Sequence, residues 1–177
     1  MSCASYSWGP SARALPGGYK EVAIPIFINQ TQEVGIEVYF TNALIQEIMR
    51  SGVAKVVDDE ASDVKIVGEL NNLQYEPSGP IISDPKKKTN YLPQETVLAS
   101  AYNTVLTVTL KMIRRGDSKE LWTGTFRGER SYGAPRVTLS GVNSVNPLYN
   151  MSARRINIEA ISGDVMAEAY DRLTENF

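Results

Sequence analysis

The sequence has no histidine and only one cysteine among its 177 residues. Histidine is the commonest general base and the commonest metal ligand, so its absence excludes a Ser-His-Asp or Cys-His catalytic site. A single cysteine excludes an internal disulfide. No apolar run approaches the roughly 18 residues of a membrane-spanning helix, and no signal peptide is visible. The formal net charge of −2 indicates no preference for nucleic acid.

The motifs that accompany catalysis or metal binding are also missing. Gly124 and Gly128 lie in a strand-like run and lack the lysine and the helix of a phosphate-binding loop. The acidic run Asp58-Asp59-Glu60 lacks the spaced oxygen ligands of a calcium loop, which favours a solvated turn. Ser100 and Ser131 have no base to activate them. We therefore expect no enzymatic activity, no metal and no cofactor.

The stretch from Lys20 to Val57 is the most informative, because its apolar period changes from that of a strand to that of a helix. Val22, Ile24 and Ile26 alternate with their neighbours, which predicts a strand with one buried face. Pro25 cannot donate a backbone hydrogen bond, so it places this strand at an edge of the sheet or leaves it paired on one side there.

A helix is predicted from about Glu33 to Gly52. Glu33 and Glu37 lie near its positive N-terminal end and Arg50 near its negative C-terminal end, as the helix dipole favours. Gly52 is a ready helix stop. The apolar stripe predicted to face the core consists of Ile36, Phe40, Ala43, Leu44 and Ile48.

Three more strands and a second helix are predicted in the remainder of the chain. The strands are expected at Asp63–Tyr75, Leu98–Ile113 and Lys119–Tyr132. Two long irregular stretches, rich in glycine and proline, are expected at Glu76–Val97 and Gly133–Met151. The final helix should begin near Ser152. Its apolar stripe consists of Ile158, Ile161, Val165, Ala169 and Leu173.

This order of elements fits one α+β domain. Two amphipathic helices on one face of a four-stranded, mostly antiparallel sheet would bury every stripe in a two-layer sandwich. Residues 19–177 should form this domain, and residues 1–18 an extended N-terminal tether. A strand-helix-strand crossover makes the first strand parallel to the strand that begins at Asp63, so both long loops should lie at one end of the sheet.

The stretch after Ala23 resembles the start of the LptE family of lipopolysaccharide (LPS) assembly lipoproteins. Pro25, Phe27, Asn29 and Thr31 fill the P-x-F-x-N-x-T pattern of that family, and FTNALIQEIM resembles its first helix. The order of elements extends the resemblance over nearly the whole chain, but only this stretch is specific.

The resemblance implies a non-enzymatic lipoprotein on the periplasmic side of the outer membrane. Such a protein plugs the LptD β-barrel, helps to assemble it and binds LPS during its delivery to the cell surface. More distantly similar proteins are lipoproteins of the CsgG and penicillin-binding-protein-activator type. They offer the alternative of a periplasmic lipoprotein that assembles or activates an envelope machine.

Cys3 is the expected lipidation site. Lipoprotein signal peptides end in small residues directly before the cysteine that receives the lipid, and Ser2 precedes Cys3 here. Each buried CH₂ of an acyl chain would add ~0.8 kcal/mol of membrane affinity. Ala4, where an aspartate would retain the protein in the inner membrane, fits sorting to the outer membrane. By itself, the cysteine would also fit a free thiol in the N-terminal segment.

The candidate LPS-binding residues are basic and lie in or beside the two long loops. They are Lys86, Lys87, Lys88, Arg130 and Arg136. Lysine and arginine make charge-assisted contacts to anions such as the phosphates of lipid A. This placement follows from topology and charge, because the basic LPS contacts of the family cannot be aligned with single residues here. The alternative is that the lysines only keep a loop solvated.

Overall fold

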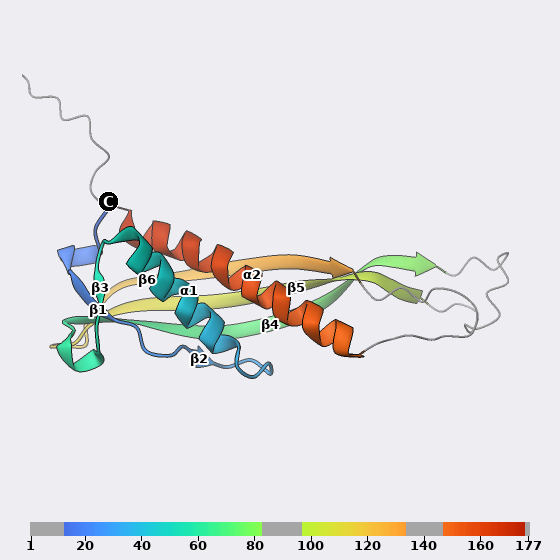
Figure 1. Ribbon diagram of the computed structural model, residues 1–177, viewed down its shortest axis with the longest axis horizontal. Coiled ribbons are helices and arrows are strands. Elements are labelled where there is room, and N and C mark those ends of the chain that lie inside the picture. The colour runs from blue at the N-terminus through green and yellow to red at the C-terminus, as the bar shows by residue number, and fades with distance from the viewer. Residues whose placement is uncertain (1–12, 83–96, 134–146, 176–177) are drawn as a thin grey trace, which may run out of the picture.

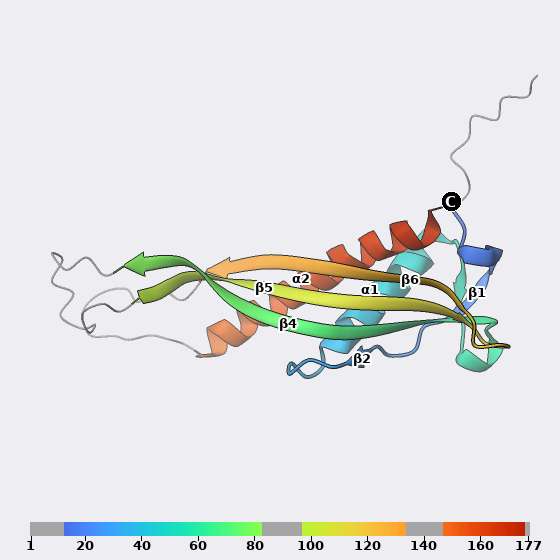
Figure 2. The ribbon, with the colours of Figure 1, turned by 180° about the vertical axis from the view of Figure 1, so that it is seen from behind.

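The structure is a computed structural model that describes residues 13–82, 97–133 and 147–175 (Figure 1). Within these residues, both α-helices lie on one face of a mixed β-sheet, which confirms the predicted α+β class. The predicted four-stranded, mostly antiparallel sheet is wrong, because the described residues form six strands in parallel and antiparallel pairs. The view from behind shows the sheet face that carries no helix (Figure 2).

The strands are β1 (Glu21–Ala23), β2 (Ile28–Asn29), β3 (Lys55–Val56), β4 (Val64–Ile82), β5 (Val97–Arg114) and β6 (Glu120–Gly133). Their order across the sheet is β3-β1-β4-β5-β6, and β2 pairs with β4 beyond the end of β1. β1 is parallel to both β3 and β4, and β2 is also parallel to β4. β4, β5 and β6 form an antiparallel meander. The parallel pairing of β1 with β4 confirms the predicted strand-helix-strand crossover.

Pro25 explains one of the two additional strands. It interrupts the N-terminal strand, so that β1 and β2 pair with β4 on either side of the break. The predicted alternation fails after the break: Ile26 is 68% exposed, whereas Phe27 is only 3% exposed. The other addition, β3, comes from the short return after the first helix, which pairs with β1.

The predicted irregular stretch from Glu76 to Val97 is shorter than expected. β4 continues through Pro77 and Pro80 to Ile82, opposite Val97 of β5. β2 pairs with β4 only as far as Leu70, so the later part of β4 has no strand on its outer side among the described residues. Proline is tolerated on such an edge, because no ladder hydrogen bond is required there.

The helices bury the predicted apolar stripes. α1 (Ile36–Ser51) is followed by Gly52 in the left-handed conformation, with φ of 66°, and the Gly52 N–H donates to the carbonyl of Ile48. This confirms the predicted helix stop. α2 (Pro147–Thr174) begins earlier than the expected Ser152, since proline at the first helical position is favourable.

The core lies between the helices and the sheet. Leu106, Val108, Leu110 and Met112 of β5 are fully buried, together with most of both helical stripes. The sheet approaches α2 closely at Gly128, where a Cβ atom would lie 2.4 Å from the Ile161 side chain. A side chain at this position would force α2 away from β6.

The N-terminal segment is attached to the end of the sheet opposite the long loops. Leu15 is 1% exposed and belongs to the core cluster. Tyr19 accepts a hydrogen bond of 2.9 Å from Nε of Arg114, and Arg13 pairs with Asp171 near the end of α2. Cys3 lies outside the described residues. Among the helices that the structure describes, none is long and apolar enough to cross a membrane.

Candidate functional site

The antiparallel meander brings two connecting segments to one end of the sheet. β4 and β6 run in the same direction, because each is antiparallel to β5. Residues 83–96 follow β4 and residues 134–146 follow β6, so both segments start from the same end (Figure 1). The N-terminal segment joins the sheet at the other end. The strand directions predicted from the crossover are therefore confirmed.

The structure describes one of the five basic residues predicted to contact LPS. Lys86, Lys87, Lys88 and Arg136 lie outside the described residues. Arg130 lies on β6, and its Nη2 and Nε atoms donate to one carboxylate oxygen of Asp164 on α2, at 2.7 and 3.1 Å. Both side chains are about half exposed, so the pair contributes at most about 1 kcal/mol. An anion with more charge than a carboxylate could compete for Arg130.

A tyrosine-arginine cluster lies beside this end of the sheet and was not predicted from the sequence. Tyr102 on β5 and Tyr132 on β6 are paired across the strands and stack with ring centroids 5.7 Å apart. Arg154 of α2 lies 4.5 Å from the ring centroid of Tyr75 on β4 and donates to the Tyr132 hydroxyl at 3.4 Å. The sequence does carry a signal for this cluster. Each of the three tyrosines is the last aromatic residue before, or the first after, one of the connecting segments 83–96 and 134–146.

The surroundings of the cluster raise the pKa values of two of its members, Tyr75 and Arg154. Burial is the main factor that raises the pKa of Tyr75 to about 12, and the negative charge of Glu33 adds to it, while Arg154 opposes the shift. The hydroxyl of Tyr75 is buried without a hydrogen-bond partner among the described residues. The hydrogen bond to Tyr132 raises the pKa of Arg154, which therefore stays charged. The cluster thus fixes a cation next to neutral aromatic rings.

Replacing Tyr75 with phenylalanine should change the response of the protein to alkaline pH. Tyr75 titrates near 10 when unfolded and about 12 when folded, so its stabilising contribution is complete below pH 10 and disappears as the pH rises to 12. Wild type should lose up to about 1.4 kcal/mol per pH unit over this window through Tyr75 alone. Urea unfolding at pH 9 and pH 11.5 should show that Tyr75→Phe escapes this loss. Equal pH slopes for the two proteins would contradict the assignment.

The motif that carries the family resemblance has a structural role. The side-chain amide of Asn29 donates to the carbonyl of Glu33 at 2.7 Å and to the carboxylate of Glu37 at 2.8 Å. Its oxygen accepts from the backbone N–H and the hydroxyl of Thr31, at 2.9 and 2.7 Å. Asn29 therefore orders the turn before α1, as asparagine does in turns of this kind.

Phe27 anchors the same motif to the sheet. Its ring covers Gly68 of β4, where a Cβ atom would lie 2.3 Å from the ring. Its backbone N–H donates to the hydroxyl of Thr41 on α1 at 3.1 Å. The motif residues thus join β2, β4 and α1 and are not placed to bind a ligand directly.

The sheet face without helices carries a polar ladder. Asn71 donates to the Thr109 hydroxyl at 2.6 Å, and that hydroxyl lies 3.2 Å from the hydroxyl of Thr125. Lys65, Thr107 and Thr109 on this face are only partly exposed. This ladder of hydrogen bonds runs across β4, β5 and β6. In the described residues, no group of three or more Cys, Asp or Glu side chains could hold a metal ion.

Solved structures show that this fold is shared by several bacterial proteins. A neuraminyllactose-binding hemagglutinin homologue from Helicobacter pylori has a TM-score of 0.55 at 12% identity, covering 96% of this chain and 92% of that one. The PelC dodecamer from Paraburkholderia phytofirmans has a TM-score of 0.51 at 13% identity, covering 93% of each chain. No curated protein matches the chain. At these identities, the likeness defines a class of α+β fold and no function.

The family follows from the sequence of the folded part. Residues 19–175 match the family model described as LptE, lipopolysaccharide-assembly. The chain belongs to this family, whose members are non-enzymatic outer-membrane lipoproteins of LPS assembly. The resemblance carried by Phe27, Asn29 and Thr31 is therefore confirmed.

Proposed function

We propose that this protein is anchored to the periplasmic side of the outer membrane by a lipid on Cys3, plugs and helps to assemble an LptD-like β-barrel, and binds LPS on its way to the cell surface. The family match over residues 19–175 carries the proposal. It favours this function over that of the CsgG-type or activator lipoproteins.

The direction of the strands supports different roles for the two ends of the molecule, membrane anchoring at one end and LPS binding at the other. Residues 1–18 would form the tether and would meet the domain of residues 19–177 at the segment that contains Leu15 and Tyr19. The opposite end carries both long connecting segments. LPS would be contacted there by Lys86, Lys87, Lys88, Arg130 and Arg136, with phosphates as the acceptors.

The position of the tyrosine-arginine cluster supports LPS binding at the same end of the sheet. Arg154 has a fixed position over Tyr75, and Tyr132 is stacked on Tyr102. Arginine next to aromatic rings offers both a charge for a phosphate and an apolar surface for a sugar ring. The polar sheet face around Thr109 and Thr125 would meet the wall of the barrel.

Co-purification and membrane fractionation test this function together. Wild type, expressed from its lipoprotein precursor, should fractionate with outer membranes and bring down a large outer-membrane β-barrel in detergent. Cys3→Ala should lose the outer-membrane fractionation when no barrel is present and should still bind the barrel when it is added. Full membrane association of Cys3→Ala without the barrel would refute the anchor. Absence of a barrel from the wild-type eluate would refute the plug.

A further inference from the structure

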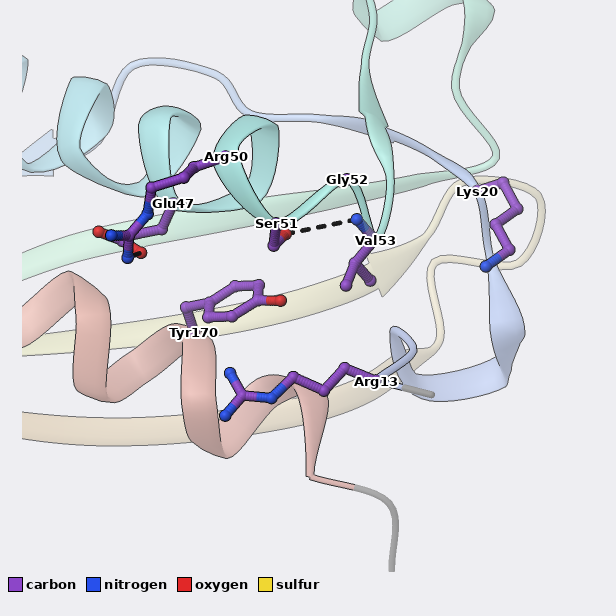
Figure 3. Close-up of a pocket in the computed structure, with 8 residues that line it drawn as sticks. All are labelled: Arg13, Lys20, Glu47, Arg50, Ser51, Gly52, Val53 and Tyr170. Atoms are coloured by element: carbon purple, nitrogen blue, oxygen red, sulfur yellow. Dashed lines mark hydrogen bonds and ion pairs between the residues drawn. The ribbon is translucent and has the colours of Figure 1, made fainter. Parts of the chain in front are cut away.

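An open pocket lies at the end of the molecule where the N-terminal segment joins the domain (Figure 3). Its volume is about 580 Å³, and it lies between the last turn of α1, the last turns of α2 and the segment that leads into β1. Three of its lining residues are basic: Arg13, Lys20 and Arg50. Glu47 is its only acidic lining residue among those described. The pocket plays no part in the LPS contacts proposed above, which belong to the opposite end.

The charges in this pocket are not all neutralised. Arg50 pairs with Glu47, and Arg13 pairs with Asp171 outside the pocket. The side chain of Lys20 has no ion pair or hydrogen bond within residues 13–82, 97–133 and 147–175, and Figure 3 shows it at the margin of the pocket, beside the segment that leads into β1. One uncompensated cation therefore borders the pocket, in addition to two arginines that are paired only at the surface.

The hydroxyl groups beside the pocket are buried or already engaged. Tyr170 of α2 is 4% exposed, and its buried hydroxyl interacts with Arg13. After the hydrogen bond to Asp171, this interaction helps to raise the pKa of the Arg13 guanidinium. Figure 3 shows this hydroxyl directed between Ser51 and Arg13. The Ser51 hydroxyl and the Gly52 N–H both donate to the Ile48 carbonyl, so the negative end of α1 is partly satisfied and repels an anion less.

We propose that this pocket binds the phosphate of a phospholipid head group in the membrane that the tether reaches. Nine residues separate Cys3 from Arg13, and the ten Cα–Cα steps between them span at most about 36 Å. The pocket would therefore remain close to the lipid surface whenever Cys3 is anchored. A phosphate is the acceptor that a surplus lysine and two arginines would share. The choice of a lipid over a soluble phosphate rests on the anchoring proposed above.

Binding of unlipidated protein to vesicles tests the pocket separately from the anchor. All proteins carry Cys3→Ala, and the vesicles contain phosphatidylcholine with or without a minor fraction of phosphatidylglycerol. Lys20→Ala should weaken binding to the anionic vesicles at least about ten-fold, because a charge-assisted hydrogen bond to a phosphate is lost. The matched control is Lys119→Ala. Lys119 is also exposed and lies near the Arg114 turn at the same end of the sheet, outside the pocket. It should weaken binding no more than about five-fold, the effect of one basic residue near an anionic surface.

Nuclear magnetic resonance distinguishes the lipid head group from free phosphate. Short-chain phosphatidylglycerol should shift the backbone amide signals of Ser51, Gly52 and Val53, and Lys20→Ala should suppress these shifts. Equal losses of vesicle binding in Lys20→Ala and Lys119→Ala would show general charge attraction and overturn the proposal. The same amide shifts with inorganic phosphate at equal concentration would also overturn it, since the lipid would then not be the selected ligand. Neither result depends on whether Cys3 is lipidated.

Discussion

Phe40→Ala should lower the free energy of unfolding by about 3–5 kcal/mol, the usual cost of removing a fully buried phenylalanine. Phe40 is 0% exposed and occupies the centre of the α1 stripe. It belongs to the same core cluster as Leu106 and Val108 of β5, with Trp122 of β6 at the margin. Removing the ring would leave a cavity between the helices and the sheet, and chemical denaturation at neutral pH would measure its cost.

Val38→Ala is the matched control for this experiment. Val38 lies on the same helix but is 45% exposed, so its truncation should change stability by no more than about 0.5 kcal/mol. A loss below about 1 kcal/mol for Phe40→Ala would mean that α1 does not rest on the sheet through this face. A large loss for Val38→Ala would indicate that the outer face of α1 is also covered.

Reversing the charges of Lys86, Lys87, Lys88 and Arg136 to glutamate should weaken LPS binding by at least about ten-fold. A hydrogen bond between charged partners contributes about 1.5–3 kcal/mol, and 1.4 kcal/mol corresponds to a factor of ten. The melting temperature and the association with the β-barrel should stay nearly unchanged, because substitutions of surface charges usually change stability by no more than about 0.5 kcal/mol. Binding of the purified protein to labelled LPS and a thermal melt would measure the two effects.

A smaller pair of variants separates local from general charge effects. Lys87→Glu with Arg136→Glu and Lys55→Glu with Lys119→Glu change the net charge by the same amount. Lys55 and Lys119 are exposed at the end of the sheet where the N-terminal segment joins. The first pair should weaken LPS binding and the second should not. An equal loss in both pairs, or an LPS crosslink at Arg114 or Arg115, would place the site elsewhere.

Periodicity was a reliable guide wherever a segment had one buried face. Both helical stripes and the inner face of β5 lie in the core, because a period of 3.6 or 2 over many residues leaves no other face to bury. Short strands were not predicted well. β2 and β3 contain two residues each and depend on backbone pairing with β4 and β1, which a hydrophobic pattern does not record. The prolines of β4 indicate a loop from the sequence alone, because the sequence does not reveal that this part of β4 is an edge without a neighbouring strand.

The candidate site was predictable only in part, for a similar reason. Strand directions placed the two connecting segments at one end, since they follow from the handedness and length of the crossover. The cluster of Tyr75, Tyr132 and Arg154 depends on the register of three strands and on the position of α2 above them. The pocket beside Lys20 depends on where the N-terminal segment crosses the helix ends, for which the sequence has no periodic signal.

The parallel pairing of β1 also fixes an order of events in folding. β4, β5 and β6 are neighbours both in the chain and in the sheet, and the tight turn after Arg114 lets β5 and β6 meet through local contacts. β1 pairs with β4 only across the whole of α1 and β3, so this contact requires a much larger loop to close and should form later. The N-terminus leaves the ribosome first, yet Val22 should find its neighbour Val64 among the last.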